Sequence, residues 1–134
     1  MKKILSFLTI CIFAMACSSQ PTYTKAENAL DAGREFIDGC LKGEFKKAEY
    51  FMLPDETNKR DLEKIRQLYL NTPNSEKLQY NHSSIVIDSV TDINDFTTII
   101  SYRNSYTMAP RKVKVVKKDD TWQVDFKEFY DGKL

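Results

Sequence analysis

The stretch VKVVKKDDTWQVDF, residues 113–126, decides the fold of the C-terminal half of the chain. Valines alternate with lysines in its first part, and large apolar residues alternate with polar ones in its last part. A side-chain period of two is typical of a strand with one buried face. The aspartate pair between the two parts suits a tight turn. The stretch therefore predicts a hairpin of residues 112–118 and 121–127. In the second strand of this hairpin, Trp122, Val124 and Phe126 are expected to face the core.

Two further strands precede this hairpin in the sequence. Residues 85–90 are rich in Ile and Val, which favour strands, and residues 92–95 form a polar turn. Residues 96–106 again alternate. The predicted inward residues of this strand are Phe96, Ile100 and Tyr102. Together these runs predict an antiparallel sheet of about four strands with one buried face.

The chain before the strands has apolar residues at helical spacing. Residues 26–41 carry an apolar stripe that includes Phe36 and Cys40, with Thr24 as the expected N-cap and Gly43 as the expected stop. Glycines within this helix indicate close packing against a neighbour, since glycine weakens a helix. Helices followed by strands predict an α+β fold.

Two shorter helices are expected between the first helix and the strands. One ends before Pro54, because the residue before a proline disfavours helical geometry. A polar loop, residues 55–59, leads to the other, residues 60–70, which Pro73 prevents from continuing. The predicted buried residues of that last helix are Leu62, Ile65, Leu68 and Tyr69.

Two stretches resemble parts of one domain family. CLKGEFKKAEYFM, residues 40–52, resembles the helix–Gly–acidic–aromatic–basic–Ala turn of small cystatin-like or nuclear transport factor 2-like domains. Residues 113–126 resemble the last hairpin of these domains, which ends in a Trp-x-Val/Ile-Asp strand. The resemblance implies a nuclear transport factor 2-like cone, in which a curved antiparallel sheet wraps around the first helix and sometimes encloses a pocket.

The N-terminus has the layout of a secretory signal. Lys2 and Lys3 precede an apolar run, residues 4–16, that is shorter than the roughly 20 residues a membrane-spanning helix needs. The run leads into AMAC, residues 14–17, which resembles the lipobox of bacterial lipoproteins. The resemblance implies that Cys17 becomes the mature N-terminus, with a diacylglycerol thioether and an amide-linked acyl chain such as palmitate as membrane anchor.

These observations divide the chain into three parts. Residues 1–16 are the predicted signal peptide, residues 17–24 the lipidated tether and residues 25–134 the α+β domain. The combination resembles an uncharacterised bacterial lipoprotein family with a nuclear transport factor 2-like domain. In Bacteroidetes-type lipoproteins, which this signal resembles, an acidic run after the cysteine often marks export to the cell surface. No such run follows here, so we expect the periplasmic side of the outer membrane.

Composition and motifs narrow the range of functions. The 20 basic and 19 acidic residues are almost balanced, which argues against nucleic-acid binding through bulk charge. The basic run at residues 111–118 is expected to be a solvated strand face. His82 has no partner at motif spacing, and Cys40 on its apolar stripe is expected to be a buried small hydrophobe. The sequence therefore predicts no metal site and no cofactor.

The resemblance to cone-shaped domains suggests a ligand pocket, and only Tyr102 and Trp122 carry polar groups among the inward strand residues. The expected pocket residues are Phe36, Tyr102, Trp122 and Phe126. Isomerase-like and cyclase-like relatives of this fold use a buried Asp or a Tyr–Asp pair. Here Asp88 and Asp125 alternate onto the opposite strand face, so no catalytic residue is assigned.

Three functions remain open. We expect a membrane-anchored, non-catalytic binding or accessory module for a partner protein or a small apolar ligand. The alternative is an isomerase-type or cyclase-type enzyme that uses the cone pocket. A third hypothesis is a cell-surface accessory protein that docks through its exposed sheet face. A hollow cone favours ligand binding, whereas a buried acid beside Tyr102 would favour the enzyme.

Overall fold

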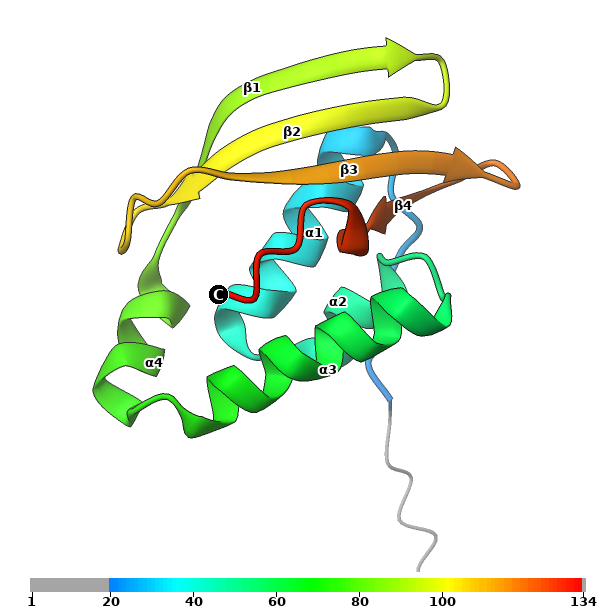
Figure 1. Ribbon diagram of the computed structural model, residues 1–134. Coiled ribbons are helices and arrows are strands. Elements are labelled where there is room, and N and C mark those ends of the chain that lie inside the picture. Colours follow the sequence, from blue (N-terminus) through cyan, green and yellow to red (C-terminus); the bar gives the residue numbers. More distant parts are fainter. Residues whose placement is uncertain (1–19, 134) are drawn as a thin grey trace, which may run out of the picture.

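The computed structural model describes residues 20–133, and within them four α-helices precede a four-stranded antiparallel sheet. This confirms the predicted α+β fold, with the helices packed on a curved sheet (Figure 1). The predicted signal, residues 1–16, and the predicted anchor, Cys17, lie outside the described residues. The elements are α1 (Ala29–Lys42), α2 (Phe45–Tyr50), α3 (Glu56–Asn71), α4 (Asn74–His82), β1 (Ile85–Asn94), β2 (Thr97–Asn104), β3 (Arg111–Lys118), β4 (Thr121–Asp125) and the 3-10 helix η1 (Phe126–Glu128).

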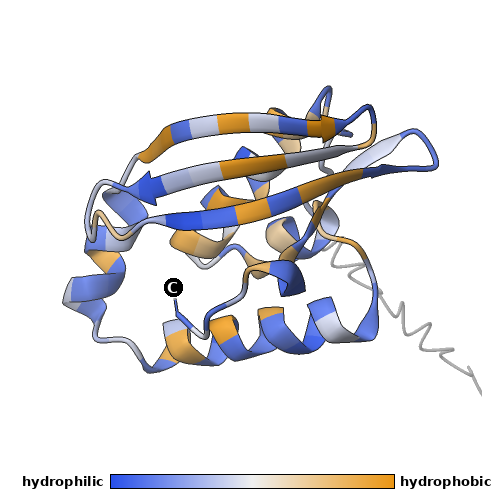
Figure 2. Ribbon diagram, turned by 45° about the horizontal axis from the view of Figure 1, so that its top comes forward, coloured by the Kyte–Doolittle hydropathy of each residue, from blue (hydrophilic) through white to orange (hydrophobic). Residues whose placement is uncertain are grey.

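The sheet is a meander with the strand order β1-β2-β3-β4. Figure 2 shows the alternation of hydrophobic and hydrophilic residues along its strands, which is the pattern that the sequence predicts. Ile100 lies opposite Val113, and Thr98 opposite Val115, in the β2–β3 register. All four side chains are buried. Because directly opposed residues share a face, this register turns the two middle strands toward α1.

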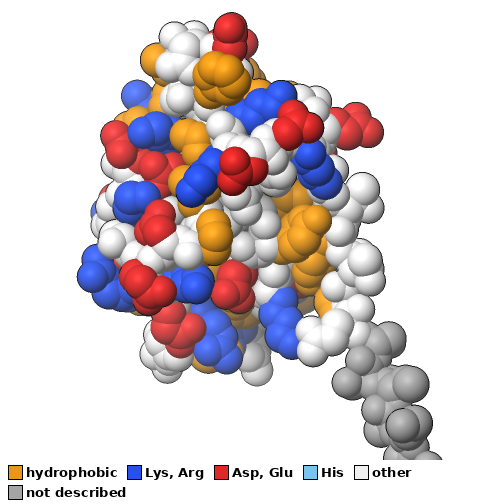
Figure 3. All heavy atoms as spheres, turned by 90° about the vertical axis from the view of Figure 1, so that its right-hand side faces the viewer, with side chains coloured by type: hydrophobic (Ala, Val, Ile, Leu, Met, Phe, Trp, Pro, Cys, Tyr) orange, Lys and Arg blue, Asp and Glu red, His pale blue; other side chains and the backbone are white. Residues whose placement is uncertain are grey.

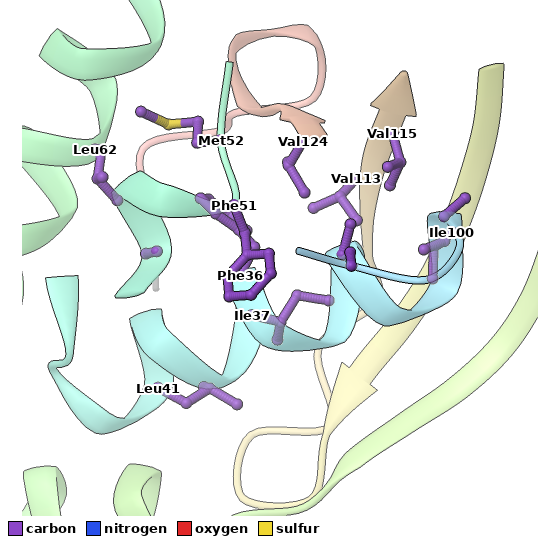
Figure 4. Close-up of a cluster of buried hydrophobic side chains, with 14 residues drawn as sticks. Phe36, Ile37, Leu41, Phe51, Met52, Leu62, Ile100, Val113, Val115 and Val124 are labelled. Atoms are coloured by element: carbon purple, nitrogen blue, oxygen red, sulfur yellow. The ribbon is translucent and has the colours of Figure 1, made fainter. Parts of the chain in front are cut away.

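Helix α1 lies beneath the concave face of the sheet and provides much of the core (Figure 1). Phe36 and Ile37 are buried in it, and the close-up shows them among side chains from the other helices and the sheet (Figure 4). At Gly33 an added Cβ would lie 2.5 Å from Cδ1 of Ile100. The glycine in this helix therefore permits close contact with β2, as its sequence position indicates.

The first helix begins later in the chain than predicted. The side-chain Oδ1 of Asn28 accepts the backbone N–H of Asp31 at 2.9 Å and caps α1. The predicted N-cap, Thr24, is therefore wrong. At the other end Gly43 adopts a left-handed conformation with φ of 73°, and it ends the helix as predicted.

The third helix begins earlier than predicted, because Asp55 caps it. The Asp55 Oδ1 accepts the backbone N–H of Asn58 at 2.9 Å. The stretch 55–59, predicted as a loop, is therefore the cap and first turn of α3. Leu62 and Ile65 are buried as expected, but Leu68 is exposed, because in this turn of α3 the neighbouring Tyr69 packs inward against Phe45.

Helix α4 was not predicted from the sequence. None of its residues is buried, so NSEKLQYNH carries no apolar stripe that would reveal a helix. Pro73 precedes its first turn and supplies a pre-organised start for the helix. His82 is the exposed last residue of α4.

The β1–β2 hairpin is longer than predicted and extends past α1 (Figure 1). Strand β1 continues to Asn94, through most of the stretch 92–95 that was predicted as a turn. Phe96 lies in the actual turn and is 60% exposed, so its predicted inward position is wrong. The outer half of β1 is exposed because no helix covers that end of the sheet.

The last strand is shorter than predicted, ending at Asp125 and continuing as η1. Val124 is fully buried, whereas Trp122 and Phe126 are half-buried and pack against the core. The free edge of β4 is covered by the chain after α2. The N–H of Val124 donates to the Phe51 carbonyl at 2.8 Å, and the N–H of Leu53 donates to the Val124 carbonyl at 2.9 Å. These bonds join the helical layer to the sheet.

Asp125 is 8% exposed, so its predicted position on a solvent-facing strand surface is wrong. The N-terminal turn of α3 covers this end of β4. There the fully buried Asn58 donates from Nδ2 to Asp125 Oδ1 at 3.2 Å and to Asp55 Oδ2 at 2.8 Å. Its Oδ1 accepts the backbone N–H of Lys127 at 2.8 Å. One asparagine therefore fastens α3 to the end of the sheet.

Candidate functional site: an apolar cavity

A cavity of about 310 Å³ lies between α1, strands β2 and β3, and the C-terminal segment that follows β4. This volume is at the lower end of the range for sites that bind small molecules, about 300–1,000 Å³. Its apolar walls are formed by Phe36, Ile37, Leu41, Ile65 and Phe126. The volume and the lining are those of a site for a small apolar molecule.

Helix α1 supplies one wall of the cavity because its apolar residues recur at helical spacing. Phe36, Ile37, Cys40 and Leu41 fall on one side of the helix. The ring of Phe36 lies 5.0 Å from that of Phe126, centroid to centroid, and Phe126 lies 5.0 Å from Tyr130. This row of aromatic rings links the core to the C-terminal segment, which forms another wall of the cavity.

The polar end of the cavity is formed by a cross-strand pair. Tyr102 on β2 lies opposite Arg111 on β3, next to the buried pair of Ile100 and Val113 two residues further along. Both pairs point to the same side of the sheet, because side chains two residues apart on a strand share a face. The register therefore extends the buried face into the cavity and brings a hydroxyl and a guanidinium to its wall.

Arg111 was expected on a solvated strand face, and the structure places it instead at the cavity wall with a side chain 14% exposed. Arg111 is two residues before Val113 and four before Val115, so strand alternation places its side chain on the same inward face. Its Nη1 donates to Asp131 Oδ1 at 2.9 Å, but its buried Nε has no hydrogen-bond partner within residues 20–133. A buried donor without a partner costs about 1–3 kcal/mol, more when it is charged.

Tyr102 lines the same cavity, as the sequence predicts. Burial raises the pKa of its hydroxyl above the usual range, with a smaller contribution in the same direction from Cys40. The hydroxyl is therefore protonated at neutral pH and serves as a hydrogen-bond donor. Among residues 20–133 no hydrogen bond to this group offsets its burial.

Cys40 also lines the cavity and is half-buried, not fully buried as expected. Burial raises the pKa of its thiol to about 12. Because the thiolate is the reactive form of cysteine, this thiol is a poor nucleophile at neutral pH. Its part in the site is that of a small, weakly polar wall residue.

The carboxylates at the cavity do not form an acid–base site. Asp88 is held by Arg103, whose Nε lies 3.0 Å from each carboxylate oxygen. Asp131 is paired with Arg111, and both carboxylates are partly open to solvent. An isomerase-type base needs a carboxyl group in apolar surroundings beside an oxyanion donor. The carboxylates that line the cavity within residues 20–133 lack those surroundings.

Trp122, the fourth predicted pocket residue, does not line this cavity, whereas Phe36, Tyr102 and Phe126 do. The alternation of apolar and polar residues in β4 correctly predicts which face of the sheet carries Trp122. It does not predict how far along the sheet Trp122 lies from the cavity. Strand β4 pairs with the far half of β3, so Trp122 lies opposite Lys117. The Lys117 Nζ is 5.7 Å from the centre of the Trp122 ring, a cation–π contact.

Figure 3 shows acidic and basic side chains intermixed on the face that carries the hairpin ends, with small apolar areas between them. Within residues 20–133 no three His, Cys, Asp or Glu side chains are grouped as metal ligands. None of the helices in that range is both long enough and apolar enough to cross a membrane.

Comparison with known proteins adds no identification. A scan against protein-family models finds no match for this chain, and a search of curated proteins finds no matching sequence.

Proposed function

We propose that this protein is a lipid-anchored envelope protein whose domain binds a small apolar ligand without transforming it. The observation that carries the proposal is the cavity of about 310 Å³ with apolar walls beneath the sheet. A domain without such a cavity would favour a protein that acts only by docking. The ion-paired carboxylates at the cavity provide no support for the isomerase-type or cyclase-type alternative.

The anchor and the location are supported by the layout of the N-terminus. A basic start, a short apolar run and AMAC at residues 14–17 are typical of an exported lipoprotein. With Cys17 lipidated, residues 17–24 would tether the domain to the membrane. The absence of an acidic run after Cys17 favours the periplasmic side of the outer membrane.

Ligand binding is tested with an uncharged apolar probe. The full chain carrying Cys17→Ala, titrated with 1-octanol in a calorimeter, is expected to show saturable binding at one site. Cys40→Met places a longer flexible side chain in the cavity and is expected to weaken that binding several-fold. The matched control, Asn81→Met, adds the same side chain at an exposed position of α4 and leaves binding unchanged. Absence of saturable binding, or equal binding by both variants, would contradict the proposal.

Lipidation is tested by metabolic labelling with a radioactive or alkyne-tagged fatty acid. The wild-type chain is expected to incorporate the label, and Cys17→Ala to lose it entirely. Cys40→Ala is the matched cysteine control and retains the label, because Cys40 lies inside the folded domain. Equal labelling of wild type and Cys17→Ala would show that the anchor is misassigned.

A further inference from the structure

The polar end of the cavity holds two donors that the described fold does not use. Arg111 has five N–H donors, and Asp131 takes one of them through Nη1. The Nε of Arg111 is buried without a partner within residues 20–133, and the half-buried Tyr102 on the opposing strand lines the same cavity. A guanidinium with an unpartnered N–H and a phenol from the opposing strand therefore both lie at one apolar space, which suits an acceptor that a ligand brings into it.

The charges around the cavity define the kind of acceptor. The charged lining residues are three cations, Arg111, Lys112 and Lys133, and two acids, Asp88 and Asp131. One of the acids, Asp88, is also held by Arg103, which lies outside the lining. Because the Asp88 carboxylate is already paired with Arg103, the lining carries an excess of positive charge and favours an anionic ligand over a cationic one.

We propose that the cavity binds a small apolar carboxylic acid as its monoanion. The carboxylate accepts hydrogen bonds from the Arg111 guanidinium and from the Tyr102 hydroxyl, and the hydrocarbon part lies along Phe36 and Phe126. This inference rests on the proposed function, because it names the ligand class of the same cavity. It is carried by the unpaired Nε of Arg111 at the end of an apolar space.

A carboxylate suits this guanidinium better than the other charged groups do. The planar fork of an arginine matches the two oxygens of a carboxylate, and the contact of Asp131 with Nη1 shows that a carboxylate reaches it. An ammonium group would face Arg111 at the same place and be repelled.

The test compares three ligands with the same hydrocarbon chain and different head groups. Octanoate, 1-octanol and octylammonium are titrated separately into the full chain carrying Cys17→Ala, so that no acyl chain on the protein competes. Octanoate is expected to bind at least about tenfold more tightly than 1-octanol, as a charge-assisted hydrogen bond in a buried site provides. Octylammonium is expected to bind more weakly than 1-octanol.

Variants test whether Arg111 and Tyr102 cause the preference for octanoate over 1-octanol. Arg111→Met is expected to remove the preference for octanoate over 1-octanol, and Tyr102→Phe to reduce it several-fold. Asp131→Asn keeps the side-chain shape but removes the negative charge that pairs with Arg111, and it is expected to strengthen octanoate binding by removing a competing carboxylate. Arg66→Met is the matched control and is expected to leave the preference unchanged, because neither Arg66, at the surface of α3, nor its partner Glu63 lines the cavity.

The outcomes separate this inference from the proposed function. Saturable binding of all three ligands with no preference for octanoate would overturn the carboxylate assignment and leave apolar binding intact. Tightest binding of octylammonium would overturn it in the same way. Binding of none of the three would overturn the proposed function itself. A preference for octanoate that survives Arg111→Met in a folded variant would show that the assigned donor is wrong.

Discussion

Asn58→Ala is expected to lower the free energy of unfolding by about 2–4 kcal/mol, the cost of leaving several buried polar partners without hydrogen bonds. The substitution removes the donor to Asp55 and Asp125 and the acceptor for the backbone N–H of Lys127. Two carboxylates and one N–H at the junction of α3 and β4 would then lack these bonds. Denaturation by urea, followed by circular dichroism, measures the change.

The control for this prediction is another asparagine of the same helix. Asn71 ends α3 in an exposed position, and Asn71→Ala is expected to change stability by no more than about 0.5 kcal/mol. If Asn58→Ala cost as little as Asn71→Ala, the buried network would not hold α3 on the sheet.

Acid should weaken the same junction. The N–H of Asn58 and then the ammonium of Lys127 lower the pKa of Asp55 below its ordinary value of 3.8. A depressed folded-state pKa stabilises the fold above the ordinary pKa, and this contribution is lost as the pH falls through the lowered value. The effect is confined to acid conditions, so it does not alter the comparison of Asn58→Ala with its control at neutral pH.

The periodicity of apolar residues in the sequence predicts the helices and strands that bury one face against the core. Alternation in residues 113–126 gives the β3–β4 hairpin and the burial of Val124, and helical spacing gives α1 and its stop at Gly43. Helix α4 is missed because it buries no residue, and a helix without an apolar stripe leaves no periodic signal. Phe96 is misplaced because alternation does not say where a strand stops and a turn begins.

The residues of the cavity were also predicted only where they follow from side-chain periodicity. Phe36, Tyr102 and Phe126 were identified because inward aromatic residues of this kind follow from periodicity. Arg111 was missed because it belongs to a basic run, and such runs usually face solvent. Strand alternation nevertheless places it on the same inward face as Val113. The partner of Arg111, Asp131, comes from the C-terminal segment, and no local rule brings that segment beside β3.

Phe36→Ala is expected to lower the free energy of unfolding by about 3–5 kcal/mol, the usual cost of removing a buried phenylalanine ring. Phe36 is 1% exposed, and its ring packs against the ring of Phe126 in a tilted arrangement with centroids 5.0 Å apart. The ring borders the existing cavity, so its loss would join the new void to that space. Urea denaturation of the variant and the wild type measures the cost.

The matched control is Phe96→Ala, which removes the same side chain from the exposed β1–β2 turn. Phe96 is 60% exposed, and its removal is expected to change stability by no more than about 0.5 kcal/mol. A loss of 1 kcal/mol or less for Phe36→Ala, by the same measure, would mean that the ring is not part of a packed core. The cavity walls would then not be fixed in place.

The enlarged cavity of Phe36→Ala also separates packing from charge in the site. Its hydrocarbon wall would be incomplete, while Tyr102 and Arg111 keep their places in the β2–β3 register. We therefore expect octanoate and 1-octanol to lose affinity by similar factors in this variant, provided that it is studied below its unfolding transition. A selective loss of octanoate binding would place the ring of Phe36, rather than Arg111, at the carboxylate. An equal loss of affinity for both ligands would be consistent with a carboxylate held by Tyr102 and Arg111, away from the Phe36 ring.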